Sequence, residues 1–474
     1  MSDHAWQRSP EECADHLERA TAWITQHMGD AADRSVWSRL EPGDVASKIP
    51  LAPPNHPEML EDVLRDLQHI IEPGMVRWDA PGWMAWFPSN AHPDAILGDL
   101  LASVSAQQGM LWTSSPACTE LETRMLEWLR CAMGLPECFA EGGAGGGVLQ
   151  DTASSAILAC MVAARDRATD GRSSRDGGTA CGGLTAYTSE QAHSSALKAA
   201  GICGIGRSNL RLIPTDRDFR MDVTALAAAM EQDIADGFLP CFCSATVGTT
   251  GCGAIDPVEA IGRVCSEHDV WLHVDAAWAG TAALSPLLRA DIVAGAEHAD
   301  SWNFNPHKWM GASFDCSSLW LADRDPLIAS MSIDPEYLRN QATESGEVID
   351  YRDWHIQLGR RFRSLKLWVL LRMTGVAALA EMVEFHVSLA EIVEQRVVRE
   401  SHLELAAPRS LSLLGICHVD GDAATQRLID SVNADDRFAV THCILDDRLV
   451  MRVAVGSAAT ALADIEAFCE FIAG

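Results

Sequence analysis

The residue of this chain whose setting points most directly to chemistry is a lysine in an aromatic, apolar run. Lys308 lies in the segment Asn303-Phe304-Asn305-Pro306-His307-Lys308-Trp309. An ammonium group in such a setting is costly unless it pairs or reacts, and desolvation lowers the pKa of a lysine so that its amine becomes a nucleophile for carbonyl groups. A structural ion pair, or a lysine that extends its charge to solvent, would also fit this segment.

A second candidate is an aspartate at the end of an apolar run. Asp275 follows the run Val-Trp-Leu-His-Val, which suits a strand buried on both faces, and small residues follow it. Ligands of α/β sheets gather at the carboxyl ends of strands, and a buried carboxylate there needs a cation or a strong donor to stay charged. Asp275 and Lys308 are therefore either an ordinary ion pair or two parts of one site.

A helix start rich in hydroxyl groups is the third candidate. The glycine cluster at 142–147 fits neither a GxGxxG dinucleotide fingerprint nor a GxxxxGK[ST] phosphate loop, because Val148 follows it and it has no lysine. The next residues open a predicted helix: Gln150-Asp151-Thr152-Ala153-Ser154-Ser155. Free N–H groups at a helix start, together with hydroxyl donors, can bind an anion, although the same residues would also serve as N-caps.

Together, these three features are the parts that pyridoxal 5′-phosphate (PLP) requires. Asp275 would hold the pyridine nitrogen as a cation, Lys308 would form a Schiff base with the aldehyde, and the helix start would bind the phosphate. His193, in the segment Gln191-Ala192-His193-Ser194-Ser195, could stack on the other face of the ring. A buried core histidine is the alternative interpretation of His193.

The elements that must position these residues alternate between short apolar runs and helical stretches. We expect strands at 184–188, 210–213, 241–247, 270–274, 301–304 and 319–321, and helices between them at 153–167, 194–200, 223–234 and 257–268. Repeated strand–helix–strand units predict an α/β fold with a mostly parallel sheet covered by helices.

Three regions follow from this pattern. Residues 1–91 form a predicted N-terminal helical segment with little core of its own, residues 92–370 a large α/β domain that binds the cofactor, and residues 371–474 a smaller C-terminal α/β domain. The stretches 169–183 and 331–350 lack an apolar period and are predicted to be loops, of which the longer is a candidate for function.

Composition excludes several classes of protein. The chain has 474 residues and a net charge of −30, which disfavours nucleic acid and anionic membrane surfaces as partners. Its 15 cysteines are spread without a CxxC pair, which favours reduced thiols over a disulfide scaffold or a metal site. Without a signal peptide or a clean apolar run of about 20 residues, we expect a cytoplasmic protein.

Several longer motifs occur in a recognisable order. They are Trp86-Phe87-Pro88-Ser89, Ser115-Pro116-Ala117-Cys118-Thr119-Glu120-Leu121-Glu122, Gly147-Val148-Leu149-Gln150, the segments around His193, Asp275 and Lys308, and Leu358-Gly359-Arg360-Arg361-Phe362-Arg363-Ser364-Leu365-Lys366. With them the chain resembles the group II PLP-dependent decarboxylases, most closely the aromatic-L-amino-acid decarboxylase branch, over about residues 10–385. The resemblance implies the PLP-dependent transferase fold of type I.

The resemblance also implies roles for single residues. Lys308 would carry the cofactor as an internal aldimine, Asp275 would pair with its pyridine nitrogen, and His193 would stack on its ring and contact substrate. The remaining cofactor contacts would be Ala153, Ser154, Asn305 and His307 around the phosphate, Thr246 near the ring oxygen, and Ala277. The substrate would meet Ser89, Trp86 and Phe87, with Trp83 or Trp112 as a further aromatic wall.

The activity implied by the resemblance is decarboxylation of an aromatic L-amino acid (tryptophan, phenylalanine, tyrosine or DOPA) to the amine. Tyr337 matches a mobile-loop tyrosine that protonates Cα after CO2 leaves. In related aldehyde synthases a phenylalanine is typical there, so Tyr337 favours simple decarboxylation over the synthase alternative. A decarboxylase for a non-aromatic amino acid is the other alternative, and no arginine is clearly placed for a distal carboxylate.

The resemblance further implies a homodimer with active sites at the subunit interface, where Gln108, Met110 and Gly359 lie near the partner's cofactor. Four positions depart from the family's pattern. Asp151 replaces a common glycine, Gln357 replaces a proline, and Gln108 and Met110 stand where animal relatives have apolar and aromatic pocket walls. These departures leave the preferred amino-acid side chain open.

Overall fold

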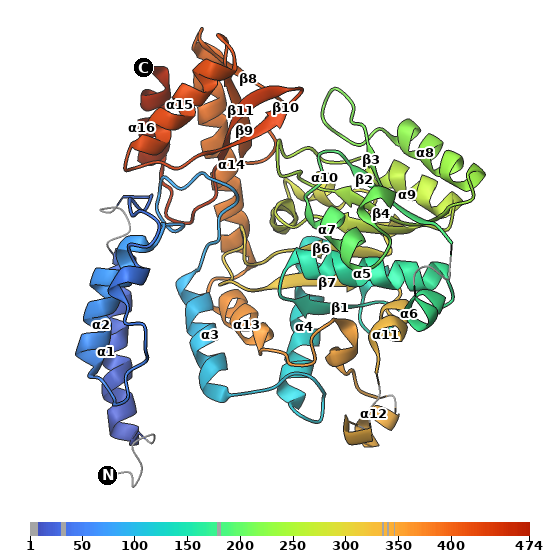
Figure 1. Cartoon of the computed structure of the whole chain (residues 1–474), viewed down its shortest axis with the longest axis horizontal. Coiled ribbons are helices and arrows are strands. Elements are labelled where there is room, and N and C mark those ends of the chain that lie inside the picture. The colour runs from blue at the N-terminus through green and yellow to red at the C-terminus, as the bar shows by residue number, and fades with distance from the viewer. Residues whose placement is uncertain (1–7, 30–34, 178–181, 334–335, 339–340, 346) are drawn as a thin grey trace.

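A seven-stranded sheet forms the centre of the larger part of the molecule (Figure 1). The computed structural model describes residues 8–29, 35–177, 182–333, 336–338, 341–345 and 347–474. The strands are β1 (Gly146–Gln150), β2 (Leu184–Ser189), β3 (Leu210–Ile213), β4 (Leu239–Thr246), β5 (Trp271–Asp275), β6 (Ser301–Phe304) and β7 (Ser317–Leu321).

Most of this sheet is parallel, as predicted. The strand order is β1-β7-β6-β5-β4-β2-β3, in which β2 to β6 pair in parallel and β7 runs antiparallel to both of its neighbours. The six predicted strands are confirmed, with ends that shift by a few residues. β1 was not predicted, because its glycines suggested a joint, yet it pairs with β7 at the edge of the sheet.

Helices cover both faces of this sheet. One face carries α5 (Ala153–Ala168), α7 (Ser195–Ile202) and α11 (Asp325–Met331), and the other carries α4 (Pro116–Met133), α8 (Val223–Ala235), α9 (Val258–Glu267) and α13 (Arg363–Met373). Successive strand residues supply opposite cores: Phe242 and Trp271 pack on the α5 side, Cys243 and Leu272 on the other. Both faces of the strands are therefore buried, which explains their continuous apolar runs.

A smaller antiparallel sheet forms a second unit. Its order is β10-β11-β9-β8, from β8 (Leu403–Leu405), β9 (Leu413–His418), β10 (Thr441–Leu445) and β11 (Arg448–Ala454), and it packs with α15 (Asp422–Ala434), α16 (Leu462–Ala473) and α14 (Val376–Arg399). Figure 1 shows α14 running from the large unit into the small one. Met84 belongs to the small unit's core, and Trp83 forms an isolated parallel bridge with Ala439. The exact domain limits at 91/92 and 370/371 stay predictions.

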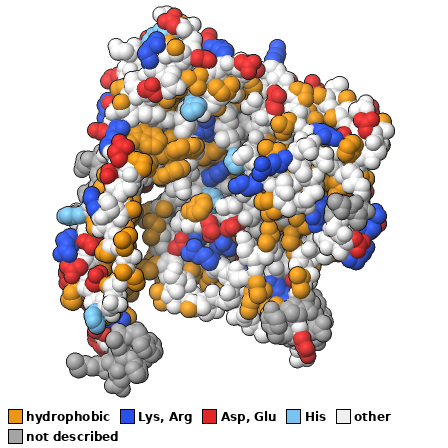
Figure 2. Space-filling view, in the orientation of Figure 1, with side chains coloured by type: hydrophobic (Ala, Val, Ile, Leu, Met, Phe, Trp, Pro, Cys, Tyr) orange, Lys and Arg blue, Asp and Glu red, His pale blue; other side chains and the backbone are white. Residues whose placement is uncertain are grey.

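The first two helices of the chain stand apart from both sheets. They are α1 (Pro10–Gly29) and α2 (Leu60–Asp66), and neither helix has a buried residue. Figure 1 shows this pair beside α3 (Pro93–Ser105), and Figure 2 shows hydrophobic side chains in the hollow between them. The predicted helices are confirmed, and they lack a core of their own within one chain.

The two predicted loops contain short helices. The first holds α6 (Arg172–Asp176), and the second holds α12 (Gln341–Ser345) and a short 3-10 turn, Glu336–Leu338. α10 (Arg289–Val293) is a further short helix of the large unit. Among the described residues, no helix combines the length and the apolar character that crossing a bilayer requires.

Candidate active site

The candidate cofactor residues meet at the carboxyl ends of the central strands. Thr246 at the end of β4 pairs with Asp275 at the end of β5, and Asp275 pairs with Asn303 of β6. A cavity of about 200 Å³ lies at this edge, lined by Phe87, Thr152, Ala153, Ser154, His193, Thr246, Gly248, Thr250, Asp275, Ala277, Trp278, Asn305, His307 and Lys308. The lining includes every residue that the sequence analysis assigned to the cofactor.

Lys308 follows β6 and brings an amine into this cavity. Desolvation lowers its pKa to about 8; the charge of Asp275 opposes this shift and that of Arg452 adds to it. Its Nζ lies 5.0 Å from the centroid of the Phe87 ring. With this pKa, roughly a tenth of Lys308 is the uncharged amine at pH 7, against less than about a thousandth for an ordinary lysine, and the uncharged amine is the nucleophile for an aldehyde.

Asp275 is the acidic group of the cavity lining. It is 8% exposed, and its Oδ1 accepts the backbone N–H of Ala277 at 3.0 Å. Its negative charge raises the pKa of both Lys308 and His193 against the effect of burial. The carboxylate can thus stabilise a cation bound in front of it, such as a protonated ring nitrogen.

The opposite end of the cavity is built to receive an anion. Thr152 caps α5 by accepting the N–H of Ser155 on its Oγ1 at 3.4 Å, so Ala153 and Ser154 occupy the first turn. Backbone N–H groups in a first turn have no intrahelical carbonyl to bind, and they attract negative charge. Among the described residues, Asn305 Oδ1 is buried without a hydrogen-bond partner, so its amide is free to turn toward a ligand.

His307 adds a neutral donor to this anion site. Its Nδ1 accepts the backbone N–H of Cys316 at 2.8 Å, which leaves Nε2 to carry the proton. Burial lowers its pKa to about 3, and the nearby charge of Lys308 adds to the shift. The ring is therefore an N–H donor without a charge.

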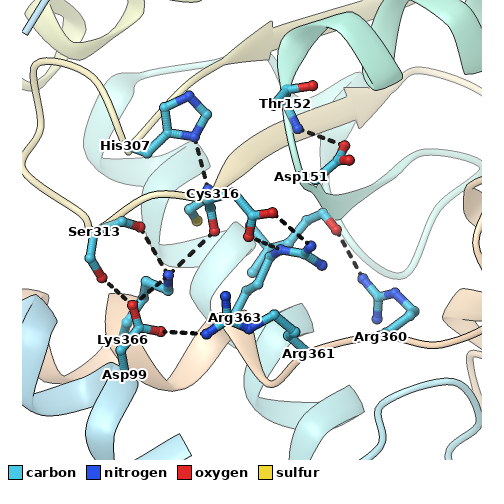
Figure 3. A network of polar contacts seen from close by, with 12 residues as sticks. Asp99, Asp151, Thr152, His307, Ser313, Cys316, Arg360, Arg361, Arg363 and Lys366 are labelled. Atoms are coloured by element: carbon cyan, nitrogen blue, oxygen red, sulfur yellow. Dashed lines mark hydrogen bonds and ion pairs between the residues drawn. The ribbon is translucent and has the colours of Figure 1, made fainter. Parts of the chain in front are cut away.

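A buried lysine holds the turn that supports His307 (Figure 3). Lys366 of α13 donates from Nζ to Asp99 Oδ2 of α3 at 2.8 Å, to the Ser313 carbonyl at 2.9 Å and to the Asp315 carbonyl at 3.3 Å. It is fully buried. The sequence motif that ends at Lys366 thus fixes the 313–316 turn, which carries both the Cys316 N–H and Phe314.

His193 and Thr246 flank the central part of the cavity. His193 is exposed to it, and its Nδ1 lies 2.9 Å from Ser195 Oγ and accepts the Ser195 N–H at 3.2 Å. The alternative of a buried core histidine is therefore wrong. Thr246 is held by Asp256, whose Oδ2 accepts its N–H at 2.7 Å. The sequence analysis missed Asp256, because its contact with Thr246 arises only in the folded chain.

The cavity opens into a wider, mainly apolar mouth of about 480 Å³. Its lining includes the four predicted substrate residues, Trp86, Phe87, Ser89 and His193. It also includes Trp78 and Phe314, which were not predicted. Within the single chain, neither Trp83 nor Trp112 forms part of this wall. Trp83 is fully buried behind Trp78, at a ring distance of 4.5 Å, and Trp112 lines a separate cavity beside Glu120.

Two positions that depart from the family's pattern contact each other near the anion site. Gln357 Nε2 lies 3.5 Å from Asp151 Oδ2, while Asp151 Oδ1 accepts the Thr152 N–H at 2.7 Å. Gln108 Oε1 accepts the Arg360 N–H at 2.6 Å, and the Met110 carbonyl accepts the Arg352 N–H at 3.0 Å. Gln108 is therefore held by its own chain.

Tyr337 and Arg452 differ from the residues above, because one was predicted but is not fully described and the other was not predicted. Tyr337 lies in the Glu336–Leu338 turn, but its side chain is outside the described part of the chain, so its role stays a prediction. Arg452 of β11 was not predicted, although an arginine inside the apolar strand Leu449-Val450-Met451-Arg452-Val453-Ala454 was a signal that could have found it.

Comparison with known proteins gives consistent matches. The family model described as "Pyridoxal-dependent decarboxylase conserved domain" matches residues 42–417. Aromatic-L-amino-acid decarboxylase of Bos taurus is 39% identical over 95% of this chain and 93% of its own length. Phenylacetaldehyde synthase of Arabidopsis thaliana is 38% identical over 92% of this chain and 90% of its own. The crystal structure of Oryza sativa TDC with PLP and tryptamine superposes with a TM-score of 0.94 at 35% identity, covering 98% of this chain and 97% of that one.

Proposed function

The chain belongs to the pyridoxal-dependent decarboxylase family, and from this premise we propose that it converts aromatic L-amino acids to the corresponding amines and CO2. The observation that carries the proposal is the single cavity that joins Lys308, Asp275 and the start of α5. The family and the fold expected from the sequence motifs are confirmed.

PLP fits the groups that line this cavity. The first turn of α5, the Asn305 amide and the neutral His307 ring suit the phosphate, while Asp275 suits the ring nitrogen and Lys308 the aldehyde. When bound, PLP accepts the electrons of a bond broken at the substrate Cα. We assign Ala153, Ser154, Thr246 and Ala277 to its remaining contacts, and His193 to the face of its ring.

The mouth of the cavity suits a flat, apolar substrate side chain. Trp78, Trp86, Phe87 and Phe314 supply aromatic walls, and Ser89 supplies a hydroxyl group. Among the described residues of its lining, Lys308 is the only Lys, Arg, Asp or Glu, so a substrate with a charged side chain would find no opposite charge there apart from the amine. An aromatic ring is therefore the substrate feature that this mouth recognises.

Exclusion of water assists the loss of CO2. A substrate carboxylate that loses its hydration in an apolar site is destabilised relative to neutral CO2. We assign closure of the site to the segment that carries Tyr337, and delivery of a proton to Cα to the Tyr337 hydroxyl. The Arabidopsis synthase makes aldehyde formation the second candidate, and the tyrosine at 337 favours the amine.

The active unit that we propose is a homodimer. α1 and α2 have no buried residue, and α3 exposes four apolar side chains, Leu97, Leu100, Leu101 and Val104, with 40–72% of their surface open. Apolar surface of this extent is typical of a subunit interface. A second copy of the chain would cover it, and Gln108 and Met110 would then lie near the partner's site.

We also propose that the protein works in the cytoplasm. The cysteines of the described residues are all unpaired. Free thiols in this number suit a reducing compartment.

The test of the proposed activity is a product assay. Wild-type protein with added PLP is incubated with L-tryptophan, L-phenylalanine, L-tyrosine, L-DOPA and L-glutamate, and amine, aldehyde, ammonia and H2O2 are quantified. Amine from the aromatic substrates, without H2O2 and without activity toward glutamate, is the expected result. Stoichiometric H2O2, aldehyde and ammonia would show a synthase instead.

The assay includes Lys308→Ala and Tyr337→Phe in parallel. Lys308→Ala should abolish turnover, because no other lysine lines the cavity among the described residues. Tyr337→Phe should lose most amine formation. Full amine formation by Tyr337→Phe would remove the tyrosine from the proposal while leaving the decarboxylase activity in place.

A further inference from the structure

One buried positive charge lies beside the cavity without a carboxylate to neutralise it. Arg452 belongs to β11 of the small unit and is 2% exposed. In the described part of the chain it forms no ion pair with an Asp or Glu, and its Nη2 is buried without a hydrogen-bond partner. A buried, uncompensated charge destabilises a fold, so a functional reason for this arginine is expected.

The contacts of Arg452 join two walls of the cavity. Its Nε donates to the Thr250 carbonyl at 2.5 Å, and its Nη1 donates to the Trp86 carbonyl. Thr250 follows β4 and lines both the cofactor cavity and the mouth, whereas Trp86 lines the mouth. One side chain of the small unit therefore ties the substrate wall to the loop that lines the cofactor cavity.

The backbone at Trp86 needs such support. Trp86 has a φ of 45°, in the left-handed region that a bulky aromatic residue rarely adopts. Trp86 is 47% exposed at the mouth, and its ring stacks on Trp78 at a centroid distance of 5.4 Å, so packing of the ring is one support of this conformation. The hydrogen bond from Arg452 to its carbonyl helps to hold it.

Phe87 connects Arg452 to the reactive amine. The Arg452 Cζ lies 4.3 Å from the centroid of the Phe87 ring, and the Lys308 Nζ lies 5.0 Å from the same centroid. The ring also stacks on Trp278 at 4.6 Å, which restrains it from behind. The two cations therefore share one aromatic ring, and this arrangement makes each of them sensitive to the other.

The groups around Lys308 come from four parts of the fold. Asp275 at the end of β5 brings a negative charge, and Arg452 on β11 brings a positive one. His193 before α7 and His307 after β6 line the same cavity. Partial desolvation lowers the pKa of His193, and burial lowers that of His307. Burial lowers the pKa of Arg452 to about 10, so this neighbour stays positively charged at neutral pH, where the two histidines are neutral.

We propose that Arg452 is a positioning residue that fixes Phe87 and the Trp86 backbone against the cofactor loop and keeps a second positive charge beside Lys308. The inference rests on the proposed function, since it gives the substrate wall its shape for an aromatic ring. The two parts of the role can be separated. The hydrogen bonds to carbonyls need the planar guanidinium, whereas the charge is also present in a lysine.

The test compares Arg452→Met and Arg452→Lys with a control on the same strand, Arg448→Met. Arg448 is exposed and pairs with Glu404 at the surface. The steady-state KM and kcat for the best aromatic substrate are measured. The visible absorbance of each holoenzyme is titrated against pH, which reports the ionisation of the linkage between Lys308 and the cofactor without turnover.

Arg452→Met should raise KM about tenfold, because the aromatic wall is no longer held, and should raise the midpoint of the absorbance titration by about one pH unit, because a nearby cation is gone. Arg452→Lys should raise KM as well but leave the midpoint close to that of wild type. Arg448→Met should match wild type in both measurements. Circular dichroism and bound PLP check that each variant folds, and Arg452→Gln replaces Arg452→Met if the latter does not.

Two results would overturn the inference. If Arg452→Met had the KM and the absorbance midpoint of wild type, Arg452 would neither hold the aromatic wall nor act on the charge of Lys308. If Arg452→Lys and Arg452→Met shifted the midpoint equally, the charge of Arg452 would have no role. A wild-type protein that forms no amine would contradict the proposed function, whereas an active wild type with an indistinguishable neutral variant would contradict the inference alone.

Discussion

The charge of Asp275 acts on the ionisation of Lys308 in the shared cavity. Desolvation lowers the pKa of the lysine to about 8, and the carboxylate limits that shift. The balance leaves an amine that is reactive near neutral pH and still protonated in part, which suits a group that must attack an aldehyde and later exchange protons. Arg452 adds a smaller effect in the same direction as burial.

The capture of PLP by cofactor-free protein should therefore depend on pH in a defined way. The unprotonated amine is the nucleophile, so the rate should rise about tenfold per pH unit below the pKa of Lys308 and level off above about pH 8. Stopped-flow absorbance over pH 6–10 measures it. A rate that keeps rising to the ordinary lysine pKa of 10.5 would mean that the amine is not desolvated as described.

The sequence predicted those site residues whose neighbours in the chain already indicate an unusual setting. Lys308, Asp275 and His193 were found because charge stands next to apolar or small residues in their own segments. Trp78, Phe314, Asp256 and Arg452 were missed. Each acts through contacts that only the fold creates, such as the approach of β11 of the small unit to the Trp86 carbonyl.

Two helices outside the sheet support the anion end of the cavity. Asp99 on α3 and Lys366 on α13 meet under the 313–316 turn, and that turn holds His307 through the Cys316 N–H. Arg363 strengthens the same turn, since its Nε donates to Asp315 Oδ1 at 3.0 Å and holds the pKa of that carboxyl below its usual range. The orientation of the His307 ring is thus fixed by elements far from it in sequence.

Lys366→Met should weaken both the fold and the cofactor site. Removing one partner of a buried pair costs about 3 kcal/mol, and the loosened turn should reduce PLP affinity by about tenfold. Chemical denaturation and a PLP titration by fluorescence measure the two effects. Lys48→Met, at an exposed position of the N-terminal segment, is the matched control. If the Lys366→Met protein folds and binds PLP as tightly as wild type, the 313–316 turn does not support the cofactor site.

Helices and strands were predicted correctly where the pattern of apolar residues was clear. The buried parallel strands were predicted from their continuous apolar runs. The helices between them were predicted from apolar residues at helical spacing. The glycine-rich β1 was missed because its pairing with β7 supplies the stability that its sequence lacks. α6 was read as loop, since its residues, Arg172-Ser173-Ser174-Arg175-Asp176, carry no apolar side chain.

The whole molecule leaves one apolar region open. α1 and α2 have no buried residue, α3 exposes apolar side chains, and Figure 2 shows hydrophobic side chains in the hollow between these helices. No core of the described part of the chain covers α1 and α2. The sequence predicted an N-terminal segment with little core of its own, and a second copy of the chain is the cover that we propose for it. A dimer would also bring a second chain close to the mouth of each cavity.

Leu101→Asp should therefore break the dimer. A carboxylate in place of an apolar side chain that is 47% exposed in the single chain costs little in the monomer and a great deal in a closed interface. Light scattering after size exclusion should show half the wild-type mass, with amine formation reduced at least tenfold. Ile234→Asp, at a position of α8 that is also 47% exposed, adds the same charge away from α3 and is the matched control. A wild-type protein that is already monomeric and active would contradict the proposed assembly.

The most direct test of the account is to trap the cofactor on the chain. The sequence has four lysines, Lys48, Lys198, Lys308 and Lys366, so the attachment site is easily assigned. The holoenzyme is reduced with borohydride, digested and mapped by mass spectrometry. We expect the pyridoxyl mass on the peptide that contains Lys308, and on no other. A label on another lysine, or no label on a protein that still forms amine, would show that Lys308 does not hold the cofactor.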